Sequence, residues 1–162
     1  MHLVEGVAHV ESVEAFVEEL ERVATTHDAT VQAFDARYVV DREHLERAVE
    51  LATRERERGE AIVRDEGVEI LLYAAGRRQI HRALEMGISE GACPVVVVVV
   101  GGDERAAVAA VENLLDQKET LGECDSERVR SFFEVSDREL EATAGTLADV
   151  VHERVAMLVV ER

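Results

Sequence analysis

Apolar and polar positions along the chain follow two periods, one typical of helices and one typical of strands. Apolar residues recur every three or four positions in three stretches: residues 11–25, 42–58 and 104–115. Residues 3–9 and 30–34 alternate between apolar and polar, which predicts strands. Ser12 and Asp41 stand just before two of the helical stretches, where their side chains can cap the first turn. The chain is therefore expected to alternate between helices and strands.

Six consecutive valines, Val95 to Val100, form the most apolar stretch of the chain. A run without a polar face is typical of a strand buried on both faces, so we expect this strand at the centre of the sheet, with helices on both sides. Residues 38–40 fit either a short strand or a buried turn. Residues 129–135 contain two adjacent phenylalanines, which favours a strand or a tight turn over a one-faced helix.

The last third of the chain predicts two short helices before a final strand. Ser136 and Thr146 can cap helices over 137–144 and 147–154, and the apolar residues 155–160 predict a strand. The sequence shows no repeat and no linker. We therefore expect one domain over residues 1–162, with an α/β (α+β) fold in which helices flank a central mixed sheet of four to five strands.

The stretch from Glu69 to Ile88 predicts two short helices that are broken at Gly76. A glycine at this position is typical of a helix that ends in a left-handed turn. Two arginines and a glutamine crowd the break: Arg77, Arg78 and Gln79. A polar, cationic helix start beside a glycine can hold an anion or a nucleotide. The same pattern also fits a helix corner in an ordinary core.

The charge balance is strongly acidic, with 35 acidic residues, 18 basic residues and a formal net charge of -17. Lys118 is the only lysine. An acidic, lysine-poor composition suits a very salty cytoplasm, because molar salt screens self-repulsion beyond about 3 Å. We therefore expect a halophilic host, an archaeon. An RNA partner in such salt would be held by stacking and hydrogen bonds more than by bulk charge.

The sequence gives little support for a membrane span, a secretion signal or a bound cofactor. The longest apolar run, residues 94–100, is far shorter than the ~18 residues that a membrane span needs. The N-terminus lacks the basic start and apolar stretch of a secretion signal, so we expect a cytoplasmic protein. Cys93 and Cys124 belong to no metal-ligand pattern and are expected to be reduced thiols. No metal and no cofactor are expected.

Catalytic motifs are also missing from the sequence. It contains no G-x-x-x-x-G-K-S/T, no G-x-G-x-x-G, no G-x-S-x-G and no H-E-x-x-H. Gly101 and Gly102 stand before a predicted helix, but the acidic residues that follow would repel a phosphate. One alternative stays open: a small α/β enzyme that binds a phosphorylated metabolite at the helix start beside Arg77 and Arg78.

Residues 64–88 contain a series of short motifs in a fixed order: Arg64, Glu69-Ile70-Leu71, Ala75-Gly76, Gln79-Ile80, Ala83-Leu84 and Gly87-Ile88. This stretch resembles the small kinase-binding subunit of the KEOPS complex, a family of archaea and eukaryotes. The resemblance extends more loosely upstream to residues 34–44 and downstream to the valine run and residues 150–160. Arg77 and Arg78 depart from the asparagine- or threonine-like residues that the family has there.

The resemblance implies a subunit without catalysis of its own. In KEOPS, a kinase-like ATPase and a transferase make threonylcarbamoyladenosine in tRNA. The small subunit docks on the N-lobe of the kinase and holds the single-stranded 3′ CCA end of the tRNA. Carried over by position, the tRNA-binding candidates are Arg64, Gly76, Arg77, Arg78, Gln79 and His81. The expected partners are the KEOPS kinase and tRNA, with no membrane and no DNA.

Overall fold

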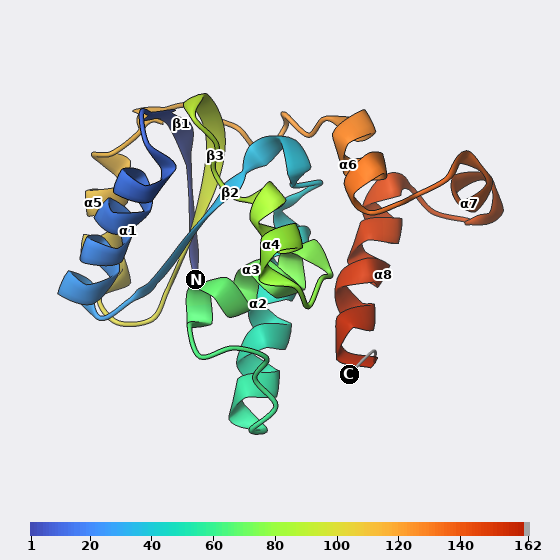
Figure 1. Ribbon diagram of the computed structural model, residues 1–162, viewed down its shortest axis with the longest axis horizontal. Helices are drawn as coiled ribbons and strands as arrows, with labels where there is room; N and C mark the ends of the chain where they lie inside the picture. The colour runs from blue at the N-terminus through green and yellow to red at the C-terminus, as the bar shows by residue number, and fades with distance from the viewer. Residues whose placement is uncertain (161–162) are drawn as a thin grey trace. The chain divides into compact units, whose positions relative to one another are not determined.

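The computed structural model describes residues 1–160 and has the mixed α/β class that the sequence predicted (Figure 1). Its contacts group into two compact units. The sheet unit comprises residues 1–36 and 87–123, and the helical unit comprises residues 37–86 and the chain from residue 124 onward. Among the described residues, no helix combines the length and the apolar character that crossing a bilayer requires.

The sheet unit contains four strands and two helices, in chain order β1 (His2–Val10), α1 (Val13–His27), β2 (Thr30–Asp35), β3 (Gly91–Val100), α5 (Glu104–Glu112) and β4 (Asp116–Gln117). The strand order is β2-β3-β1-β4, and every pair is antiparallel. The number of strands agrees with the prediction, but the expected mixed pairing is wrong. The reason is that β3 lies between β1 and β2, so the two strands that α1 connects never pair with each other.

The valine run forms most of β3 and lies inside the sheet, as predicted. Val95 to Val99 are all fully buried. Every second valine of this run joins the core formed with α1 and α5, which includes Phe16, Leu20 and Val111. Ser12 caps α1 through the N–H of Ala15, as the sequence predicted.

The helical unit consists of helices and turns, in chain order the last two residues of a 3₁₀ helix (Ala36–Tyr38), α2 (Arg42–Glu57), α3 (Glu66–Ala75), α4 (Ile80–Ala83), a 3₁₀ helix (Leu84–Met86), α6 (Ser126–Phe132), α7 (Asp137–Ala142) and α8 (Leu147–Val160). Residues 69–75 of α3 are all buried. A helix that is apolar on every side requires neighbours on every side. Both α2 and α8 contact α3.

Two stretches of the helical unit are helical against expectation: residues 129–135, for which a strand or a tight turn was favoured, and residues 155–160, which were predicted to form a strand. Residues 126–132 form α6, so Phe132 is its last residue and Phe133 follows it. Because the chain leaves the helix between these two positions, both phenylalanines can point inward. Residues 155–160 continue α8, whose buried residues Val151, Val155 and Leu158 follow a helical spacing. An all-apolar hexamer carries no polar position to define its period, so the helix upstream decides its conformation. Tyr38 ends a 3₁₀ helix and residues 39–40 lie in neither a helix nor a strand, so the expected alternative of a short strand is wrong.

Both cysteines are free thiols within the described chain. Cys93 is buried in the core of the sheet unit. Cys124 is half-buried in the helical unit, where burial raises the pKa of its thiol and reduces its reactivity at neutral pH.

Candidate functional site

The break between the two predicted helices is a well-defined turn at the end of α3. Asp65 caps the start of α3 by accepting the N–H of Val68 at 3.0 Å. Gly76 ends the helix with φ 61° and ψ 33°, which confirms the predicted left-handed turn. Its N–H donates to Tyr73 and that of Arg77 donates to Leu72, each at 3.1 Å, which is the pattern of a Schellman motif.

Gly76 also brings α3 close to α8. A Cβ atom at this position would lie 3.2 Å from the carbonyl oxygen of Arg154. Any side chain would therefore strain the left-handed backbone and crowd α8 at the same time. Both effects make Gly76 a structural residue of the turn.

Arg77 points back into the helical unit, and its side chain is only 17% exposed. Its guanidinium donates to the carbonyl oxygen of Phe132 and lies 3.5 Å from the Glu134 carboxylate. It also stands 5.3 Å from the centre of the Phe132 ring. Arg77 therefore closes the end of α6, where carbonyl groups lack partners within the helix.

Arg154 of α8 completes the same cap from the other side. It donates to the carbonyl oxygens of Phe133 at 3.2 Å and Glu134 at 3.4 Å. Its two terminal nitrogens bind Glu139 at 2.7 and 2.8 Å, and this bidentate pair raises the pKa of Arg154. Sequence analysis missed Arg154, because nothing local links it to a helix that ends some twenty residues earlier.

A small hollow of about 180 Å³ remains beside this cap. Its lining residues come from the end of α3, the end of α6 and the middle of α8: Ala75, Gly76, Arg77, Phe133, Glu134 and Arg154. The polar groups that line it are the same ones that hold the three helices together. The hollow is therefore a by-product of the cap more than a prepared binding pocket.

Two further predicted residues, Gln79 and His81, lie with three neighbours on an exposed surface at α4. We call it the α4 surface, and it consists of Gln79, Ile80, His81, Arg82 and Leu84, all of which are exposed. Gln79 precedes α4 without capping it through its side chain. Ile80 and Leu84 are large apolar residues that are nevertheless 44% and 56% exposed. Arg78 is half-buried beside this surface, and its Nε atom has no hydrogen-bond partner among residues 1–160.

Arg64 lies apart from these residues. It immediately precedes the N-cap of α3, whereas Gly76 ends the same helix. Ten helical residues separate the two ends, a distance of about 15 Å. The structure therefore brings Arg78, Gln79 and His81 together and places Arg64 at the opposite end of α3.

Glu69 of the same stretch is buried and organises the loop that carries Arg64. Its carboxylate accepts the N–H groups of Ile62 and Val63, both at 2.9 Å. Arg56 donates to the carbonyl oxygen of Val63 at 2.8 Å and lies 3.8 Å from the Glu69 carboxylate. A buried carboxylate needs such partners, so Glu69 is a structural residue of the loop.

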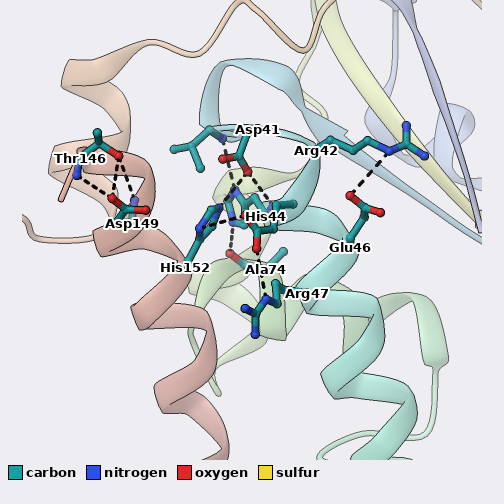
Figure 2. A network of polar contacts seen from close by, with 11 residues as sticks. Asp41, Arg42, His44, Glu46, Arg47, Ala74, Thr146, Asp149 and His152 are labelled. Atoms are coloured by element: carbon teal, nitrogen blue, oxygen red, sulfur yellow. Dashed lines mark hydrogen bonds and ion pairs between the residues drawn. The ribbon is translucent and has the colours of Figure 1, made fainter.

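His44 joins the start of α2 to the last turn of α3 (Figure 2). Its Nδ1 atom accepts the N–H of Val40 at 3.3 Å, and its Nε2 atom donates to the carbonyl oxygen of Ala74 at 2.8 Å. Burial lowers the pKa of His44 to about 4. The ring is therefore neutral at neutral pH, in the tautomer that both hydrogen bonds require.

The fold and this site define a small α/β protein in which a buried helix presents a short exposed turn. A family described as "Kinase binding protein CGI-121" matches residues 8–158. The chain therefore belongs to this family, the kinase-binding KEOPS subunits that residues 64–88 resemble. No curated protein matches the chain.

Proposed function

We propose that this protein is a non-catalytic KEOPS subunit that binds the complex's kinase/ATPase and the 3′ CCA end of tRNA. It thereby supports the threonylcarbamoyladenosine modification of tRNA in the cytoplasm. The observation that carries the proposal is the family match over residues 8–158. The exposed α4 surface, which lies at the motif that resembles the family, supports the RNA part of the proposal.

The α4 surface has the chemistry that an unpaired nucleotide end requires. Ile80 and Leu84 offer apolar area on which a base can pack. Gln79 and His81 can form hydrogen bonds to base edges, and Arg78 stands beside them. Base stacking contributes about 1–3 kcal/mol per base, largely independent of bulk charge. Such contacts suit a protein with a net charge of -17, which attracts no phosphate backbone at long range.

The other candidates take different roles in this proposal. Gly76 and Arg77 shape the turn from behind, because one forms the left-handed cap and the other is bound to α6. Arg64 lies at the other end of α3, a helix about 15 Å long, so it serves a more distant phosphate of the same tRNA strand. The RNA contacts proper are Arg78, Gln79 and His81.

The test is co-purification in molar KCl with the host's KEOPS kinase and total tRNA. We expect recovery of the kinase and at least tenfold more intact tRNA than tRNA trimmed of its CCA end. The double variant Gln79→Ala/His81→Ala should reduce retention of intact tRNA to the trimmed level and leave kinase recovery unchanged.

A matched control changes the same residue types on the sheet unit. Gln117 and His9 are both exposed there, so Gln117→Ala/His9→Ala should retain intact tRNA like the unaltered protein. Equal retention of intact and trimmed tRNA would contradict the CCA site. Failure to recover the kinase would contradict the partner assignment.

A further inference from the structure

An imidazole held between two carboxylates lies at the junction of α2 and α8. His152 of α8 approaches Asp41, the N-cap of α2, and Glu43 in the first turn of α2. Figure 2 shows His152 directed at Asp41 and the first turn of α2. One ligating atom from each of these three residues lies within 4.8 Å of the others.

The hydrogen bonds determine which ring nitrogen carries a proton in the neutral imidazole. Oδ1 of Asp41 lies 2.9 Å from Nε2 of His152 and accepts the N–H of His44 at 2.8 Å. Because the Asp41 carboxylate acts as an acceptor, Nε2 of His152 is the donor. The other ring nitrogen, Nδ1, then presents a lone pair.

That lone pair faces a second acceptor. Nδ1 of His152 lies 3.7 Å from Oε2 of Glu43, which is too far for a hydrogen bond. Arg47 approaches the other oxygen of this carboxylate, Oε1, at 3.5 Å. Oε2 and Nδ1 therefore stand opposite each other as two electron-pair donors, an arrangement that a cation between them would stabilise.

The separation also suits a shared metal ion. Zinc binds imidazole nitrogen and carboxylate oxygen at about 2.0–2.2 Å, so neighbouring ligand atoms lie roughly 3.0–3.5 Å apart. A small movement of the exposed Glu43 side chain brings the observed 3.7 Å into this range. The hydrogen bond from Nε2 to Asp41 matches the carboxylate partner that orients most metal-binding histidines.

We propose that Nδ1 of His152 and the carboxylate of Glu43 bind one divalent transition-metal ion, with Asp41 orienting the imidazole. Imidazole with carboxylate favours zinc, cobalt or nickel over magnesium or calcium. The side chain of Glu43 is 54% exposed and that of His152 is 17% exposed, so the ion enters from solvent and meets a fixed imidazole. The bound ion fastens α8 to the first turn of α2.

The experiment is a cobalt titration of the purified, tag-free protein, followed by visible absorption and by competition with zinc. We expect one cobalt ion per chain, displaced by zinc and not by magnesium. Glu43→Gln and His152→Gln should each weaken cobalt binding at least tenfold. Zinc should also raise the midpoint of thermal unfolding of the unaltered protein and leave that of Glu43→Gln unchanged.

The matched control is His9→Gln. His9 forms an exposed pair with Asp116, Nε2 to Oδ2 at 2.5 Å, and belongs to no three-ligand group among residues 1–160. This variant should bind cobalt like the unaltered protein. Glu43 is a surface residue, so its variant keeps the proposal testable even if His152→Gln does not fold.

Two outcomes would overturn the proposal. One is cobalt binding that neither variant weakens. The other is an absence of cobalt binding by the unaltered protein at neutral pH. Neither readout involves tRNA or the kinase, so this test is independent of the proposed function.

Discussion

His44 is the side chain that joins the start of α2 to the last turn of α3 by a hydrogen bond while remaining uncharged. Its ring fills a fully buried position and packs against the Phe133 ring in a T-shaped arrangement at a centroid distance of 5.8 Å. A protonated ring would keep the bond to Ala74 but lose the one in which Nδ1 accepts from Val40. Protonation therefore opposes folding through both desolvation and a lost hydrogen bond.

The stability of the protein should fall as the pH drops from 6.5 towards 4. The folded pKa of His44 is lowered to about 4 from 6.5, so in this window the unfolded chain binds a proton that the folded chain does not. From pH 7 to pH 5, His44 alone should lower the free energy of unfolding by about 2 kcal/mol. Urea unfolding at a series of pH values measures this.

His44→Gln and His81→Gln separate this effect from other titrating groups. His44→Gln should be less stable at pH 7 and lose this part of the pH dependence, because its side chain takes up no proton. His81 is exposed, so His81→Gln should keep the whole pH profile. An unchanged profile in His44→Gln would refute the assignment.

At the scale of elements, the end of α6 shows how side chains from elsewhere in the fold can supply the hydrogen bonds that the last turn of a helix lacks. α6 has seven residues and ends at Phe132, and its last carbonyl groups bind arginines from the turn after α3 and from α8. Short helices are marginal on their own, so such tertiary caps carry much of their stability. The residue after the cap, Glu134, has φ 56°, an uncommon backbone conformation for a residue other than glycine.

Arg77→Met should destabilise the protein by about 2 kcal/mol, because it keeps an unbranched apolar stem but removes a charged hydrogen bond to α6. Arg138→Met, at an exposed position on α7, should change stability by less than about 0.5 kcal/mol. Urea unfolding at pH 7 measures both. Full stability of Arg77→Met combined with loss of tRNA retention would instead identify Arg77 as an RNA contact.

Local signals made most elements predictable from the sequence. Ser12, Asp41 and Gly76 act within one turn of their own positions, and each does what its residue type predicts. The valine run was recognisable as an internal strand because six consecutive apolar residues are also a local signal. The end of α8 and the whole of α6 were not, because their apolar residues carry no clear period and their conformation depends on tertiary neighbours.

The sequence did not distinguish exposed candidate residues from those whose side chains are used inside the fold. Gln79 and His81 are exposed as a binding role requires, whereas the cationic character of Arg77 is used inside the fold. A guanidinium that binds RNA and one that caps a helix look the same in a sequence. Only the position of Phe132, 55 residues further along, distinguishes them.

For the whole molecule, the excess of acidic residues determines the conditions in which it is stable. A net charge of -17 on 162 residues produces self-repulsion that salt screens. The screening length falls from about 10 Å at 0.1 M salt to about 3 Å at 1 M. The midpoint of thermal unfolding should therefore rise by at least ~3 °C, equivalent to about 1 kcal/mol for a chain of this length, between 0.1 and 2 M KCl.

Sucrose at matched osmolality provides the control, since it is excluded from protein surfaces without screening charge. It should stabilise the protein less than KCl does. A midpoint that is insensitive to KCl would contradict the expectation of a host with a salty cytoplasm.

The position of β3 between β1 and β2 has a consequence for synthesis on the ribosome. Val4 pairs with Val97, so neither of the first two strands can find its partner until the valine run has been translated. At about 5–20 residues per second, the roughly 60 residues between the end of β2 and the valine run require some 3–12 s. During those seconds the nascent chain carries two strands that lack their partner in the sheet.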